Sequence, residues 1–412
     1  MQHHTSRRVF LAGAWAGGAV LKASAARSAY TYEEIEKMLA QGDIRGRLAK
    51  RDLPTPALCL DLDAFEHNVE KMAAHARQSG KALRPHGKTH KCPEIARRLI
   101  RAGAAGACVA KLSEAEVFAR EGVKGLLVTT AVIGARKVER AVRLAARHRD
   151  TIFSADDPAN LRELNDAAGR AGIQLQVAID LFIGGRTGVP TGEPALKVAE
   201  LTQGLRHLRL AGIQAYCGPA SHRVGFEERR AFSREAMLDA VETRRLLESK
   251  GIACPLLSGG STGTYNIDSE LEGVTELQPG SYIFMDIDYN RIGGADGPVY
   301  RDFRNSLFVI TTVVSKPQPG LAVVDGGLKA FSTDKPFPPE AKGREGISFA
   351  WGGDEHGRLT LEGAARELRV GDLVEFVIPH CDPTVNLYNR LYALRGDRVE
   401  EAWPVSARGM SQ

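Results

Sequence analysis

The stretch ALRPHGKTHK, residues 82–91, places a short apolar run directly before a cluster of lysines and histidines. Ala82 and Leu83 have the character of a buried strand, and Lys88 follows where such a strand would end. Cationic side chains crowded around one turn repel one another, so a surface loop has little reason to collect them. The stretch therefore predicts a strand that opens into a functional site, with a solvated basic loop as the alternative.

Seven further short apolar segments follow along the chain, and helical segments separate most of them. Eight strands alternating with helices predict an α/β fold, a (β/α)8 TIM barrel over residues 63–295. An open doubly wound sheet is the alternative, but no GxGxxG follows the first strand. The expected strands lie near residues 82–86, 106–109, 125–130, 151–154, 174–180, 211–217, 255–258 and 274–277.

From residue 296 the pattern changes to strands and turns without long helices, which predicts a C-terminal β domain over 296–412. Residues 26–62 read as a lead-in, and the alternating segment 55–61 within it is expected to join the β domain as a strand. A helix is predicted from about 64 to 78, with Asp63 in a capping box at its start.

Residues 1–25 have the features of an export signal of the twin-arginine type. Arg7 and Arg8 are paired, an Ala/Gly-rich apolar run follows from residue 10 to residue 21, and Ala23-Ser24-Ala25 resembles a cleavage site. The apolar run is too short for a stable membrane span. We expect a soluble mature protein in the periplasm, with a disordered basic tail as the alternative.

The composition argues against nucleic acid as a partner. The net charge is +5, and part of it comes from the N-terminus. No basic stripe with interleaved aromatic residues is present. The six cysteines show no CxxC spacing for a structural zinc, and five of them read as small buried hydrophobic residues. Nucleic acid is therefore not expected as a partner.

Lys88 has the surroundings of a reactive amine. Arg84, His86, His90 and Lys91 lie beside it in the sequence, and nearby positive charge favours the neutral form of a lysine. A neutral amine at the rim of a barrel suits Schiff-base chemistry. On these grounds Lys88 is the predicted nucleophile.

The segment SGGSTG, residues 258–263, follows the seventh expected strand, where phosphate sites of barrels lie. The backbone N–H groups of Gly259, Gly260 and Ser261, with the hydroxyls of Ser258, Ser261 and Thr262, are placed to hold a dianion. A plain turn is the alternative. A phosphate site opposite a Schiff-base lysine implies pyridoxal 5'-phosphate.

Two further segments carry polar groups. In AIDLFIGGRTGV, residues 178–189, Arg186 is placed to keep a pyridine nitrogen unprotonated, or else to form a salt bridge that holds the loop.

In IPHCDPTVNLY, residues 378–388, His380 and Asp382 lie two positions apart and suit Mg²⁺, Mn²⁺ or another divalent ion. Two ligands leave positions for water and substrate, which is typical of a catalytic metal.

On these segments the chain resembles the fold-type III pyridoxal phosphate enzymes, in particular the D-threonine aldolase and D-serine dehydratase group, over about residues 50–405. The resemblance implies an alanine racemase-like barrel with a β domain, assembled as a homodimer. It assigns Lys88 as the Schiff-base lysine and Arg186 to the pyridine nitrogen. It also places Tyr216 beside the cofactor, directs Tyr282 to the phosphate, and gives His86 or His90 a role in proton transfer.

His380-Cys381-Asp382 resembles the aldolase pattern, whereas the dehydratases of the group tend to carry His-x-Cys as a zinc pair. The resemblance thus implies a lyase dependent on pyridoxal phosphate and on Mn²⁺ or Mg²⁺, with Zn²⁺ as the alternative. It would cleave D-3-hydroxy amino acids to glycine and an aldehyde. A D-serine or D-3-hydroxyaspartate dehydratase, an amino-acid racemase and a non-catalytic cofactor carrier or binding protein are the alternatives.

Overall fold

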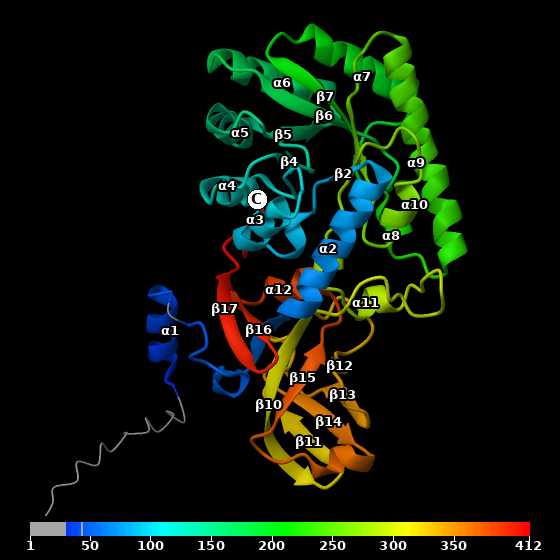
Figure 1. Cartoon of the computed structure of the whole chain (residues 1–412). Coiled ribbons are helices and arrows are strands. Elements are labelled where there is room, and N and C mark those ends of the chain that lie inside the picture. Colours follow the sequence, from blue (N-terminus) through cyan, green and yellow to red (C-terminus); the bar gives the residue numbers. More distant parts are fainter. Residues whose placement is uncertain (1–29, 43) are drawn as a thin grey trace, which may run out of the picture.

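The structure is a computed structural model that describes residues 30–42 and 44–412 (Figure 1). The predicted export signal, residues 1–25, lies outside the described residues. A parallel sheet with its helices occupies one end of the molecule and a second sheet occupies the other (Figure 1). No helix in the described ranges is long and apolar enough to cross a membrane.

Eight parallel strands form the first sheet in the order β2-β9-β8-β7-β6-β5-β4-β3. The two end strands approach each other at the parallel bridge between His86 and Cys108, where the Cys108 N–H donates to the Pro85 carbonyl at 3.0 Å. Residues 82–91 therefore close the sheet into a TIM-like barrel, and the predicted barrel is confirmed. The strands are β2 (Ala82–Leu83), β3 (Ala107–Val109), β4 (Leu126–Val128), β5 (Ile152–Ala155), β6 (Leu175–Asp180), β7 (Leu208–Ala215), β8 (Leu256–Gly259) and β9 (Glu276–Leu277).

The strands of the barrel alternate with helices, whose apolar faces pack on the sheet. Asp157 caps one of them, accepting the Asn160 N–H at 2.9 Å. The predicted cap Asp63 is wrong by two residues, because Asp61 accepts the Ala64 N–H instead. The helices are α2 (Leu62–Ser79), α3 (Pro93–Arg101), α4 (Leu112–Arg120), α5 (Ala135–Arg147), α6 (Pro158–Arg170), α7 (Glu193–Gly204), α8 (Gly218–Ser221), α9 (Phe226–Ser249), α10 (Tyr265–Asp268) and α11 (Ile287–Asn290).

A second sheet of nine strands forms the β domain, in the order β13-β14-β11-β10-β1-β16-β17, with β15 pairing β10 and β12. Strand β1 (Ala57–Asp61) lies in its centre, antiparallel to β10 and parallel to β16. Helix α1 (Tyr32–Ala40) precedes β1, and α12 (Cys381–Val385) follows β15. The other strands are β10 (Leu307–Gln318), β11 (Leu321–Val324), β12 (Glu340–Ala341), β13 (Ile347–Trp351), β14 (Gly357–Leu361), β15 (Leu373–Val377), β16 (Arg390–Arg395) and β17 (Arg398–Pro404).

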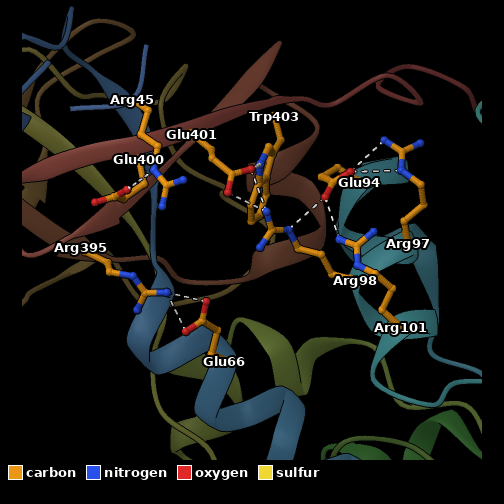
Figure 2. Close-up of polar contacts among 10 residues, drawn as sticks. All are labelled: Arg45, Glu66, Glu94, Arg97, Arg98, Arg101, Arg395, Glu400, Glu401 and Trp403. Carbon is orange, nitrogen blue, oxygen red and sulfur yellow. Dashed lines mark hydrogen bonds and ion pairs between the residues drawn. The ribbon is translucent and has the colours of Figure 1, made fainter. Parts of the chain in front are cut away.

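Charged side chains join the barrel to the β domain (Figure 2). Arg98 of α3 donates to both carboxylate oxygens of Glu401 on β17, at 2.7 Å each, and lies over the Trp403 ring at 4.5 Å. On the other side of this boundary, Arg395 of β16 reaches Glu66 of α2 at 2.6 Å. The two domains also pack through apolar side chains, since one buried cluster runs through both of them.

We expect Arg98→Ala to lower the free energy of unfolding by about 1–2 kcal/mol, because it removes an ion pair and a cation–π contact across this boundary. The matched control is Arg101→Ala. Arg101 lies on the same helix and shares the Glu94 carboxylate with Arg98, but is more exposed. The control should cost less than about 0.5 kcal/mol. Urea unfolding followed by tryptophan fluorescence measures both, and equal losses would contradict the role given to Arg98.

Candidate active site

A cavity of about 190 Å³ lies at the carboxyl ends of the barrel strands and is closed on one side by the β domain. Barrel and β-domain residues both line it, so neither domain forms the site alone. Eight of the predicted site residues are among the lining residues: His86, Lys88, Arg186, Tyr216, Ser261, Thr262, His380 and Asp382.

Lys88 and Asp382 meet across the domain boundary. Lys88 lies in the 3-10 turn Gly87–Thr89, which follows β2 after three residues, and its Nζ is 3.4 Å from Oδ1 of Asp382 on α12. The carboxylate is the largest influence on Lys88 and raises the pKa of its amine. Burial raises the pKa of Asp382, but the charges of Lys88 and His380 outweigh it and bring that pKa down to about 2. The two groups therefore form an ion pair.

The other cationic side chains of residues 84–91 have carboxylates of their own. Arg84 pairs with Glu276 at 2.8 Å inside the barrel, and Lys91 pairs with Glu114 at 2.5 Å. The expectation that crowding by positive charge neutralises Lys88 is thus wrong. The neighbouring charges are paired, and the carboxylate in contact with Lys88 raises the pKa of its amine instead.

The two predicted histidines have different places. His86 lines the cavity, with Nε2 3.2 Å from Thr129 Oγ1, and burial holds its pKa well below the ordinary value. His90 does not line the cavity. It is buried, its Nδ1 accepts the Cys92 N–H at 3.1 Å, and burial lowers its pKa to about 3. Of these two histidines, only His86 is placed to exchange a proton with a ligand.

The predicted phosphate loop presents its tip, and not its beginning, to the cavity. Ser261 and Thr262 line the cavity, whereas Ser258, Gly259 and Gly260 do not. Ser258 is a buried residue of β8 that donates to Glu276 at 2.7 Å, because the alternation of the strand directs it into the barrel. A Cβ at position 259 would lie 2.4 Å from the Ala215 carbonyl oxygen, so the glycine there permits strand packing.

Tyr282 also lies behind the cavity wall. Its ring is fully buried, burial raises the pKa of its hydroxyl, and it contacts Phe303 with ring centroids 5.5 Å apart. Its backbone N–H donates to Thr262 Oγ1 at 2.9 Å. Its contribution is therefore to hold the side chain of Thr262, while its own hydroxyl does not reach the cavity.

Arg186 and Tyr216 contact each other on the opposite wall, with the guanidinium carbon 5.0 Å from the ring centroid. Asp180 also lines the cavity and accepts hydrogen bonds from Thr187 at 2.7 Å and Gln214 at 3.0 Å. Burial is the main cause that raises the pKa of Asp180. Gln214 of β7 was not predicted, although it lies two residues before Tyr216, which follows the end of the strand, and both residues line the cavity.

His380 is oriented by a carboxylate that the sequence did not single out. Asp334 Oδ2 lies 2.6 Å from His380 Nδ1, and the Nε2 of His380 is 4.0 Å from Asp382 Oδ2. Carboxylate support of one ring nitrogen is common for metal-binding histidines. Within the described residues, no group of three or more His, Cys, Asp and Glu side chains is close enough to hold a metal ion.

His222 and Asp288 add a second unpredicted pair at the cavity. His222 lines it, with Nδ1 2.8 Å from Asp288 Oδ2, and Lys335 reaches the same oxygen at 2.7 Å. Burial opposes the shift, but His222 and Lys335 lower the pKa of Asp288 to about 2. The residues lie far apart in the sequence, so no local pattern marks them.

Asp288→Asn should lower stability at pH 7 by about 1 kcal/mol, a figure reduced for solvent screening. Because the folded-state pKa of Asp288 is depressed, its contribution is present above the ordinary value of 3.8 and is lost as the pH falls towards 2. The difference between wild type and variant should therefore shrink between about pH 4 and pH 2 in urea unfolding. Asp354→Asn, an exposed control, should show no such change. A pH-independent difference for Asp288→Asn would count against the ion pairs.

Two protein families match the chain in sequence. The family described as the alanine racemase N-terminal domain matches residues 60–288, more than half of the chain. The family described as a putative serine dehydratase domain matches residues 306–394. The matched ranges correspond to the barrel and to much of the β domain.

Individual proteins match over most of the chain. A 3-hydroxy-D-aspartate aldolase of Paracoccus denitrificans (strain Pd 1222) is 40% identical over 362 residues, 87% of this chain and 93% of that protein. A D-threonine aldolase of Arthrobacter sp. is 39% identical over 359 residues, with the same two coverages. The crystal structure of D-threonine aldolase from Filomicrobium marinum matches with a TM-score of 0.84 and 38% identity, covering 89% of this chain and 98% of that one.

Proposed function

The chain belongs to the D-threonine aldolase and D-serine dehydratase-like family of fold-type III, alanine racemase-like enzymes, and from this premise we propose that it is a pyridoxal phosphate-dependent lyase. Its reaction would be the retro-aldol cleavage of D-3-hydroxy amino acids, of the D-threonine type, to glycine and an aldehyde. The observation that carries the proposal is the single cavity shared by Lys88 of the barrel and by His380 and Asp382 of the β domain.

The residues of the cavity fit pyridoxal phosphate. Lys88 offers its amine, Ser261 and Thr262 offer donors for a phosphate, and Arg186 with Tyr216 forms a wall for a ring. Thr89 also lines the cavity, and its buried hydroxyl has no hydrogen-bond partner among the described residues, as expected beside a polar ligand. When bound, the cofactor supplies the electron sink that such a cleavage needs.

We propose that a divalent ion, Mn²⁺ or Mg²⁺ with Zn²⁺ as the alternative, is held by His380 and Asp382. An imidazole nitrogen and a carboxylate are donors that such ions accept, and the remaining positions would be left to water and substrate. Asp334 supports the proposal because it fixes the tautomer of His380, leaving Nε2 to face Asp382. The ion would supply a Lewis acid that lowers the pKa of a substrate hydroxyl.

The protein groups are arranged for the two proton movements of the reaction. The β-hydroxyl loses a proton as the Cα–Cβ bond breaks, the electron pair remains at Cα, and Cα then receives a proton to give glycine. His86 is neutral because burial lowers its pKa, and its Nδ1 accepts the Lys88 backbone N–H at 3.4 Å, so its proton lies on Nε2 beside Thr129, from where it can be donated to a ligand in the cavity. Lys88 holds a proton at Nζ next to Asp382, within the same cavity.

Product analysis tests the proposal. D-Threonine with the protein, pyridoxal phosphate and Mn²⁺ should give glycine and acetaldehyde, and a chelator should stop the reaction. Asp382→Ala should lower kcat/KM by roughly 100-fold or more. The control is Asp397→Ala, an exposed aspartate of the β domain that contacts only Lys50 in the described structure and should leave the rate unchanged. Ammonia and 2-oxobutanoate would instead identify a dehydratase, and inversion at Cα would identify a racemase.

Export to the periplasm by the twin-arginine route is a further proposal, supported by the sequence of residues 1–25 alone. Fractionation of cells that express the full chain would test it.

A homodimer is proposed from the resemblance to the fold-type III enzymes, and light scattering of the purified protein would test that assembly.

A further inference from the structure

Arg229, in the first turns of α9, is a fully buried arginine without a carboxylate partner in the described part of the chain. Its guanidinium donates to four main-chain carbonyl oxygens: those of Gly263 and Gly293 at 2.8 Å, and those of Arg223 and Ile292 at 2.9 Å. All its hydrogen-bonding partners are thus neutral.

Such an arrangement leaves the charge only partly compensated, because Asp302 attracts the guanidinium without forming a hydrogen bond or ion pair with it. A buried guanidinium is normally paired with an anion, because carbonyl dipoles replace only part of the hydration that the ion loses. Burial accordingly lowers the pKa of Arg229, which indicates that its charged form is disfavoured where it lies. An anion bound nearby would stabilise it.

The position of Arg229 relative to the cavity identifies where that anion would lie. Gly263 directly follows Thr262, which lines the cavity, whereas Arg229 itself does not. Tyr300 joins the two, since its hydroxyl donates to the Thr262 carbonyl at 2.6 Å and its ring centroid lies 5.7 Å from the guanidinium carbon. The guanidinium therefore contacts the loop from the side opposite the cavity.

The loop is packed closely at Gly263. A Cβ at Gly263 would lie 2.1 Å from the Ser221 carbonyl oxygen, so the backbone is packed closely there. The Arg229 guanidinium contacts the carbonyl of Gly263, the residue next to Thr262 of the cavity wall, so little more than one peptide unit separates its charge from the cavity. In a low-dielectric interior, its field is weakly screened over that distance.

We propose that Arg229 is a positioning residue for the phosphate of the cofactor. It would fix the carbonyl side of the loop at residues 261–263 and place a positive charge that no carboxylate contacts behind the dianion. The inference rests on the proposed pyridoxal phosphate site and adds to it a residue that contacts neither cofactor nor substrate. It implies that Arg229 contributes selectively to the binding of ligands that carry a phosphate.

The test compares two ligands of the apoprotein, pyridoxal phosphate and pyridoxal, by absorbance titration of wild type and Arg229→Gln. We expect the affinity for pyridoxal phosphate to fall roughly tenfold or more, with the affinity for pyridoxal changed less than about threefold. The matched control is Arg230→Gln. Arg230 is the next residue of α9, partly exposed and paired with Glu270 at 3.0 Å, and its loss should alter neither affinity.

Equal losses of affinity for the two ligands in Arg229→Gln would overturn the inference and leave Arg229 a merely structural residue. Should that variant fail to fold, Arg229→Lys decides the question, because it keeps the charge. Its preference for pyridoxal phosphate over pyridoxal should stay within about threefold of wild type, and loss of the preference with the charge in place would contradict the proposal. Wild-type protein that binds neither ligand would overturn the cofactor assignment itself, a result distinct from a selective change.

Discussion

The closeness of Lys88 and Asp382 is the constraint on which the site depends, because the two residues belong to different domains. At 3.4 Å it requires the barrel rim and the start of α12 to be held in fixed relation. Arg98, Glu401 and the apolar cluster that runs through both domains maintain that relation. A shift of about 1 Å between catalytic groups is enough to reduce a rate substantially, so residues far from the cavity contribute to its chemistry through the domain boundary.

Closure of the barrel fixes the position of Lys88. The stretch that carries Lys88 is also the stretch that joins the first barrel strand to the second, through the bridge between His86 and Cys108. A Cβ at Gly280 would lie 2.5 Å from Thr89 Oγ1, so the loop after the last strand presses directly on the lysine turn. Fold and site are therefore specified by the same residues, and a change that loosens the closure also displaces Lys88.

The sequence was sufficient for features that repeat or that sit at strand ends. The strand pattern predicted the barrel, and its strand ends located Lys88, Arg186 and Thr262, all of which line the cavity. It was insufficient where a side chain's partner lies far along the chain. Ser258 turns into the barrel, His90 is buried behind the wall, and Asp334 reaches His380 from 46 residues away. Such pairings depend on three-dimensional register, which no local pattern records.

The central claim is that the barrel lysine and the β-domain pair serve one site, and crystals grown with pyridoxal phosphate and Mn²⁺ test it most directly. The account predicts electron density continuous from Lys88 Nζ into the cofactor, together with an anomalous manganese peak bound by His380 and Asp382 in the same cavity. Cofactor joined to another lysine, or a manganese peak away from His380 and Asp382 in crystals where the cofactor is bound, would contradict it.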